Sequence, residues 1–259
     1  MTNSSKKELK QSLEKLYNKF NNIVFIDSDP IFFPHQYRKE TDIEVVAFIS
    51  ACFAFGRVSQ INKTLKLIFE KMGKSPAEFL LTTGPSELSN IFEGFKYRFV
   101  DKPMLCSFLL GIKKTLLKYG SLKSCFLRGY SLVWDGFYRL FESIGGSYLL
   151  PNPRGNSACK RLNLFLRWMV RNDNIDFGFW SEVETKNLIV PLDTHIYSIG
   201  KELGFTTRKS ADRKTALQIT EGFKNIFPND PLKYDFALCR SGILLNNKFV
   251  KIAVSIDKI

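Results

Sequence analysis

Apolar residues recur at three- and four-residue spacings through most of this chain, and Gly or Pro separates the successive runs. Residues 8–20 show the pattern clearly, because Leu9, Leu13, Leu16 and Phe20 would form one stripe along a helix. Runs of β-branched residues are short, and no alternating hairpin with an Asn-Gly turn occurs. The spacing therefore predicts an all-α protein.

Helix boundaries follow from the same pattern together with N-cap residues, Pro at first turns and Gly at ends. A nearly continuous apolar run after Asp42 predicts a core helix over residues 43–55. Residues 157–171 are predicted as a strongly basic helix, because Lys160, Arg161, Arg167 and Arg171 alternate with apolar residues. Residues 22–37 and 172–187 read as an irregular connector and a polar linker. The other predicted helices span residues 59–72, 77–82, 86–92, 103–119, 122–128, 131–144, 194–203, 215–227 and 231–245.

The charge balance favours a polyanionic partner. Lys and Arg number 38 against 25 Asp and Glu, which leaves a formal charge of +13 on a chain with 44% hydrophobic residues. Such a composition is typical of a folded basic protein, so nucleic acid is the leading expectation, although some proteins are basic without binding it. At 259 residues we expect a single module and a monomer.

The sequence contains no uncharged apolar run of ~18 residues and no signal peptide, so we expect a cytoplasmic protein without a membrane partner. The odd number of widely spaced cysteines favours buried thiols in a reducing compartment. These are Cys52, Cys106, Cys125, Cys159 and Cys239. Their spacing matches neither a zinc site nor an iron–sulfur cluster, and with two His in the chain we predict no metal and no cofactor.

A Pro- and Gly-containing turn, residues 150–156, precedes the predicted basic helix. Backbone N–H groups at a helix start attract anions, so we expect Arg154, Gly155, Asn156 and Ser157 to contact a DNA phosphate. The simpler alternative is an ordinary proline-rich turn. Lys160 would lean back toward the same end of the helix, although most lysines on a basic helix are merely solvated.

Residues 191–197, Pro-Leu-Asp-Thr-His-Ile-Tyr, put the Asp193 carboxylate at a helix start, where helix capping is the structural alternative. This segment resembles the Val-Asp-Thr-His-Ile-Phe type of sequence in helix-hairpin-helix DNA glycosylases of the endonuclease III, MutY and 8-oxoguanine glycosylase kinds. Residues 49–51, 60–64 and 75–80 resemble the opening helices of the same domain, and residues 95–98 are similar to the aromatic-basic turn that precedes its fourth helix. In residues 29–35, 54–57, 157–161 and 234–238 the chain is most similar to a bacterial family, DUF2400, at the edge of that superfamily.

The resemblance implies a two-lobed glycosylase fold with a cleft between the lobes. We expect one lobe from about residues 42–150 and the other from residues 1–41 plus 151–259. It also implies that Asp193 stabilises positive charge on the deoxyribose and that Lys160 forms a Schiff base at C1′. The two are 33 residues apart, a spacing similar to that of archaeal 8-oxoguanine glycosylases.

Further contacts with damaged duplex DNA are expected from Arg57, Arg161 and His195, of which His195 has packing or capping as its alternative. An enzyme that flips a base out of the duplex also needs a pocket with aromatic walls. The candidate walls are Phe55, Trp168, Phe179 and Trp180, with ordinary core packing as the alternative.

These observations favour a DNA base-excision glycosylase with AP-lyase activity, acting on a damaged base with an oxidised purine among the candidates. A non-catalytic nucleic-acid-binding protein of the same fold is the first alternative. The second is a helical protein–protein adaptor whose basic surface is incidental.

Overall fold

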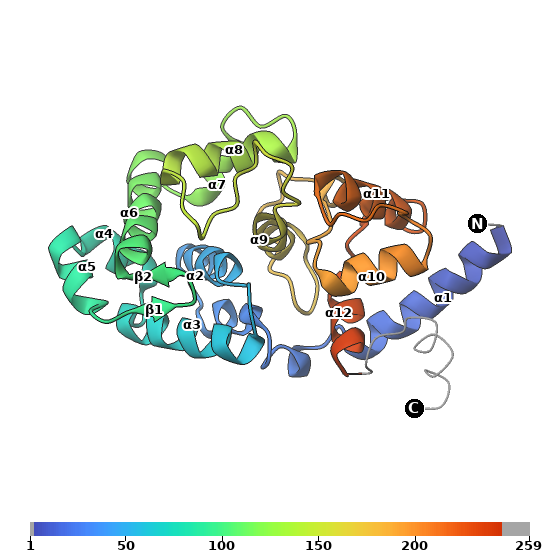
Figure 1. Ribbon diagram of the computed structural model, residues 1–259, viewed down its shortest axis with the longest axis horizontal. Coiled ribbons are helices and arrows are strands. Elements are labelled where there is room, and N and C mark those ends of the chain that lie inside the picture. The colour runs from blue at the N-terminus through green and yellow to red at the C-terminus, as the bar shows by residue number, and fades with distance from the viewer. Residues whose placement is uncertain (1–2, 245–259) are drawn as a thin grey trace. The chain divides into compact units, whose positions relative to one another are not determined.

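The computed structural model describes residues 3–244, and these residues are mostly helical, which confirms the prediction of an all-α protein at that level (Figure 1). The described residues contain two short strands, β1 (Lys96–Tyr97) and β2 (Val100–Asp101), which pair antiparallel and were not predicted. No helix within residues 3–244 has both the length and the apolar character needed to cross a membrane.

The chain divides into two compact units. Unit 1 combines the chain up to Ile26 with the chain from Asn156 onward, and unit 2 runs from Asp27 to Gly155. Residues 27–41 and 151–155 belong to unit 2, whereas the predicted lobes group them with the N-terminal and C-terminal segments. The two lobes of a glycosylase fold remain a prediction that rests on the resemblance.

Unit 2 is built around α2 (Glu40–Cys52), in which every residue from Asp42 to Cys52 is buried. Nearly continuous apolar sequence explains this burial, and Figure 1 shows α2 among the other helices of the unit. Those elements are η2 (Pro30–Phe32), η3 (Pro34–Gln36), α3 (Val58–Met72), α4 (Pro76–Thr82), α5 (Pro85–Ile91), α6 (Lys102–Tyr119), α7 (Leu122–Leu127) and α8 (Val133–Ile144).

Two acidic residues of α2 are buried because they cap other helices. The Asp42 carboxylate accepts a hydrogen bond from the Ala77 backbone N–H, 2.9 Å away at the start of α4. Glu44 accepts from the N–H groups of Leu122 and Lys123 at 2.8 and 3.0 Å, where α7 begins. The helix predicted to start at residue 43 therefore begins earlier, at Glu40, and Asp42 lies inside it and caps α4 instead of its own helix.

Unit 1 contains α1 (Asn3–Phe20), η1 (Ile23–Phe25), α9 (Lys160–Val170), η4 (Thr185–Asn187), α10 (Thr194–Glu202), α11 (Arg213–Lys224) and α12 (Asp235–Leu244). Within it α12 packs against α1 and α10, and α10 packs against α11. The segment after α9 folds back, because Phe177 N–H donates to Trp168 O and Trp180 N–H to Met169 O, both at 2.8 Å. The predicted polar linker is thus partly core.

The predicted basic helix differs from α9 in two ways. It begins at Lys160 instead of residue 157, because Cys159 has a left-handed backbone with φ of +47°. Arg167 and Arg171 are 3% and 4% exposed, so half of its predicted cations face the interior. Both arginines pair with aspartates, as described below, and these ion pairs allow the two side chains to lie among apolar neighbours.

Candidate functional site

Asp193 is the N-cap of α10, as the structural alternative predicted. Its Oδ1 accepts hydrogen bonds from the backbone N–H groups of His195 and Ile196, at 2.9 and 2.8 Å. Its Oδ2 accepts from the Cys239 thiol of α12, with 3.8 Å between oxygen and sulfur. The half-buried carboxylate is therefore held in one orientation, and capping uses one of its two oxygens.

Lys160 is the first residue of α9 and is half-buried. Two hydrogen bonds hold the segment before Lys160. Ser157 Oγ accepts from Cys159 N–H at 3.1 Å, and Asn156 O accepts from the N–H of Arg213 on α11 at 2.8 Å. A left-handed backbone is unfavourable for a residue with a side chain, so these contacts hold Cys159 in a strained conformation directly before Lys160.

The Cys239 thiol beside Asp193 is surrounded by charged groups. Burial raises the pKa of the Cys239 thiol well above its ordinary value, and the carboxylates of Asp193 and Asp235 raise it further. The positive charges of Arg167 and Lys160 act in the opposite direction. Asp193, Cys239 and Lys160 all belong to unit 1, and of these three the structure brings Asp193 and Cys239 into direct contact.

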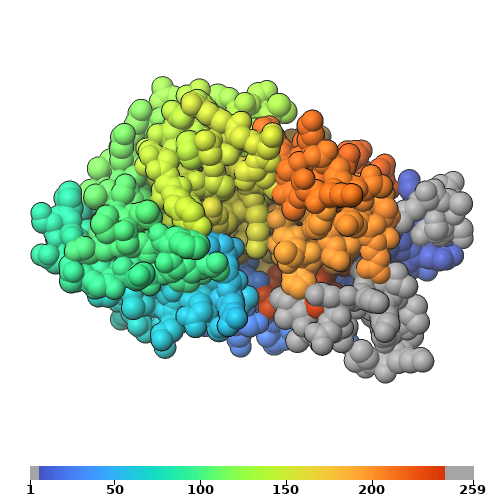
Figure 2. Space-filling view, viewed as in Figure 1, coloured from blue at the N-terminus to red at the C-terminus, as the bar shows by residue number. Residues whose placement is uncertain are grey.

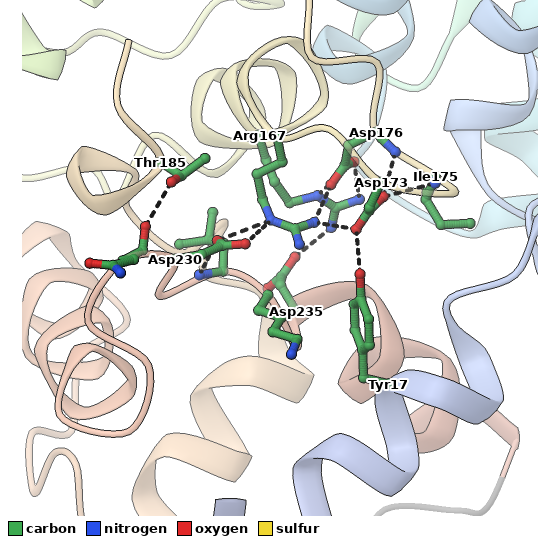
Figure 3. A network of polar contacts seen from close by, with 12 residues as sticks. Tyr17, Arg167, Asp173, Ile175, Asp176, Thr185, Asp230 and Asp235 are labelled. Carbon is green, nitrogen blue, oxygen red and sulfur yellow. Dashed lines mark hydrogen bonds and ion pairs between the residues drawn. The ribbon is translucent and has the colours of Figure 1, made fainter. Parts of the chain in front are cut away.

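Unit 1 also contains a buried network of ion pairs, shown in Figure 3. Arg167 donates through Nε and Nη2 to Asp176, both at 3.2 Å, and through Nη1 to Asp235 at 2.6 Å. Burial opposes the charge of Arg167, but the two carboxylates more than compensate and raise the pKa of the guanidinium. Arg167 therefore stays charged and ties α9 to α12.

Arg171 extends the network. Its Nη1 contacts Asp176 at 2.5 Å and Asp173 at 2.9 Å, and its Nε contacts Asp230 at 2.9 Å. The Tyr17 hydroxyl of α1 donates to Asp173 at 3.3 Å, and burial together with that carboxylate raises the pKa of Tyr17 to about 12. The network thus joins α1, α9, α12 and the segment after α9.

Negative charge exceeds positive charge in this network, because two guanidiniums face four carboxylates. Asp235 Oδ1 is buried without a hydrogen-bond partner. Burial raises the pKa of Asp235 to about 6, with Arg167 opposing and the charge of Asp193 adding to the rise. Among residues 3–244 no group of three or more His, Cys, Asp or Glu side chains is arranged to hold a metal ion.

The residues predicted to contact DNA fall in both units. In unit 2, Arg154 pairs with Glu142 at 3.0 Å and lies over the Tyr138 ring, 4.4 Å from its centroid. Gly155 and Arg57 are exposed in the same unit. In unit 1, Asn156 and Ser157 are exposed, whereas Arg161 and His195 are half-buried.

The aromatic residues predicted to line a base pocket have different surroundings. Trp168 and Trp180 are at most 1% exposed and belong to the core of unit 1, where Trp180 packs edge-on against Phe165. Phe179 is half-buried and stacks on Phe177, with 5.7 Å between ring centroids. Phe55 lies in unit 2 against Tyr97 and Tyr148.

Sequence reasoning gave no role to Cys239, Asp235 or Asp176. A signal existed for Asp235, because a carboxylate within the apolar run of residues 234–238 needs a buried cation. Cys239 carried no local signal, since its proximity to Asp193 depends on how α12 packs against α10.

The sequence of this site can be compared with those of known proteins. The model of the family described as "Protein of unknown function (DUF2400)" matches residues 29–244. The chain belongs to this family. The DUF2400 match includes Lys160, Asp193, Asp235 and Cys239, so these four residues lie in the region that defines the family. No curated protein and no solved structure matches the chain.

Proposed function

We propose that this chain is a DNA base-excision glycosylase with AP-lyase activity, with a two-lobed fold of the helix-hairpin-helix glycosylase kind. One observation carries the proposal: Asp193 is a partly exposed carboxylate held in one orientation by two backbone N–H groups and the Cys239 thiol, in the same unit as the partly exposed Lys160. The resemblance around Asp193 and the charge of +13 support DNA as the substrate.

The role proposed for Asp193 is electrostatic. Breaking the bond between a base and deoxyribose leaves positive charge on the sugar, and a fixed carboxylate stabilises that charge best where water is excluded. Two backbone N–H groups fix Asp193, which favours this role because the carboxylate needs no reorientation during the reaction. The excess negative charge of the buried ion-pair network acts in the same direction.

The role proposed for Lys160 is nucleophilic. Its neutral amine attacks C1′, the C1′–N bond breaks, and the base leaves with the electron pair and takes up a proton. The nitrogen then loses one proton, the C1′–O4′ bond breaks with O4′ taking up a proton, and a protonated Schiff base forms. Loss of a C2′ proton from it expels the 3′ phosphate and cuts the strand. Strain at Cys159 supports a functional position here, because strained residues concentrate at active sites.

Borohydride trapping tests the lysine. The wild-type chain should form a covalent adduct with duplex DNA carrying an abasic site, 8-oxoguanine or uracil, and Lys160→Gln should not. Lys214→Gln is the matched control, because Lys214 is an exposed lysine of α11 in the same unit. No adduct with any of these duplexes, or equal trapping by Lys160→Gln, would refute lyase chemistry.

Asp193→Asn tests the aspartate with little risk to folding, because Asn is as good an N-cap as Asp. We expect base release to be lost while affinity for the damaged duplex stays within about twofold of wild type. Unchanged base release would remove Asp193 from the mechanism. Salt-sensitive DNA binding without base release by the wild-type chain would instead support the non-catalytic nucleic-acid-binding alternative.

A further inference from the structure

Unit 2 contains a strongly basic pocket that the proposed chemistry does not use. It has a volume of about 380 Å³ and lies between α3 and the β1–β2 hairpin. Figure 2 shows these two segments, light blue and green, side by side on one face of the unit. Its volume falls within the range of small-ligand sites, so it is large enough for more than an inorganic ion.

Positive charge dominates the wall of this pocket. Four cations line it, Lys63, Lys71, Lys96 and Arg98, against one acid, Glu93. Glu93 is already paired with Lys102 at 2.5 Å, and Lys71 donates to Ile91 O. Within residues 3–244 no carboxylate pairs with Lys63, Lys96 or Arg98, so these three charges are available to an anion.

Backbone geometry fixes Arg98 at this wall. The residue begins the two-residue turn between β1 and β2 with φ of +52°, a region that side chains rarely adopt. Its guanidinium occupies the space beside Gly56, where a Cβ would lie 2.7 Å from Nη1. The Tyr97 hydroxyl donates to Phe55 O and holds the turn against the same segment. Arg98 is therefore positioned by the fold and strained, as residues at binding sites often are.

Apolar and aromatic residues form another part of the wall, beside the polar Gln60 and Thr64. Leu67 is 42% exposed, and Phe92, Phe95 and Tyr97 also line the pocket, each at most 9% exposed. A ligand that matches both parts carries a phosphate for the cations and a flat or apolar group for this part of the wall. Lys and Arg are the residues that proteins use to bind phosphate.

We propose that this pocket, which we call the α3–hairpin pocket, binds the phosphate of a nucleotide unit, presented either by a nucleic acid strand or by a free nucleotide. The inference goes beyond the proposed function, because it assigns a phosphate site to unit 2 that is independent of Lys160 and Asp193.

The test compares the wild-type full-length chain with Lys63→Gln/Lys96→Gln, in which both replaced lysines are exposed and unpaired. The matched control is Lys74→Gln/Lys114→Gln, which removes equal charge from exposed positions of unit 2 outside the pocket. One arm measures binding of deoxyadenosine 5′-monophosphate by calorimetry. The other measures affinity for an undamaged duplex over a series of salt concentrations.

We expect the pocket variant, but not the control, to lose about 2- to 30-fold in affinity, the range for two exposed charge contacts. Loss confined to the duplex, with a salt dependence reduced by about two charges, identifies a strand phosphate as the ligand. Loss of mononucleotide binding identifies a free nucleotide. Equal behaviour of pocket and control variants in both arms overturns the proposal.

The result of this pocket test is independent of the result of the borohydride test of the proposed function. At saturating DNA the pocket variant should still be trapped by borohydride if Lys160 is the nucleophile. Failure of trapping in the wild-type chain leaves the calorimetric and salt-series results unchanged.

Discussion

Removing Arg167 should be among the most damaging single changes to unit 1. Arg167→Met keeps an apolar stem of similar length but leaves Asp235 buried, 5% exposed, without its cation. Breaking a buried ion pair by removing one partner costs about 3–5 kcal/mol, a large part of the ~5–15 kcal/mol that stabilises a typical domain. A protonated Asp235 carries no buried charge, so the loss of unfolding free energy in Arg167→Met should be larger at pH 8 than at pH 5.

Urea unfolding followed by tryptophan fluorescence measures this loss. Trp168 and Trp180 lie in unit 1 and Trp134 in unit 2, so a Trp134→Phe background makes the emission report unit 1 alone. The double variant Arg167→Met/Asp235→Leu removes both charges, and we expect it to recover at least about half of the loss, since apolar groups often replace buried ion pairs without cost.

Two results would contradict this reasoning. A loss below about 1 kcal/mol for Arg167→Met would mean that the pair is solvated. Absence of any recovery in the double variant would mean that Arg167 acts through packing, for instance against the Phe236 ring 5.9 Å away, and not through its charge.

Three further predictions follow from the fold and the site. The pKa of Asp235 is raised from 3.8 to about 6, so the folded protein holds this proton more tightly than the unfolded chain. The resulting contribution to the free energy of unfolding, about 3 kcal/mol, is present below about pH 4 and is lost as the pH rises through 6. A pH series of unfolding free energies should show this loss in the wild type and not in Asp235→Asn. Gly111→Ala should lower the unfolding free energy by about 1–3 kcal/mol in urea titrations, because a Cβ would lie 2.2 Å from Ile144 O where α6 packs on α8. Cys239 should react slowly with iodoacetamide at pH 8, and Asp193→Asn should speed the reaction, measured by peptide mass spectrometry, because removing the carboxylate lowers the thiol pKa; equal rates would contradict their contact.

Local signals in the sequence predicted the helices well. The helix predicted over residues 59–72 is α3, Val58–Met72, and it ends where Gly73 adopts φ of +73°. Capping residues and glycines act over a few neighbouring positions, so a single sequence is enough to locate such boundaries. The β1–β2 hairpin escaped prediction because its turn is Arg-Phe, without the Gly or Asn that marks such turns.

Long-range partners could not be predicted from the sequence. Arg167 and Asp235 are 68 positions apart, so the same arginine is predicted as a surface cation on local pattern and lies in the core. The capping role of Asp193 was among the predicted alternatives, because it depends on the next three residues alone. The thiol beside its second oxygen required tertiary structure, and the catalytic roles stay predictions.

Unit 1 is assembled from both ends of the polypeptide, with α1 packed on α12 and the whole of unit 2 inserted between them. During synthesis the ribosome therefore makes α1 before unit 2 and its packing partner α12 after unit 2. Unit 2 alone takes roughly 6–25 s to emerge at about 5–20 residues per second, long enough for many small domains to fold. Helix α1 must wait through this interval without α12, so chaperones that shield nascent amphipathic segments have a long opportunity to bind it.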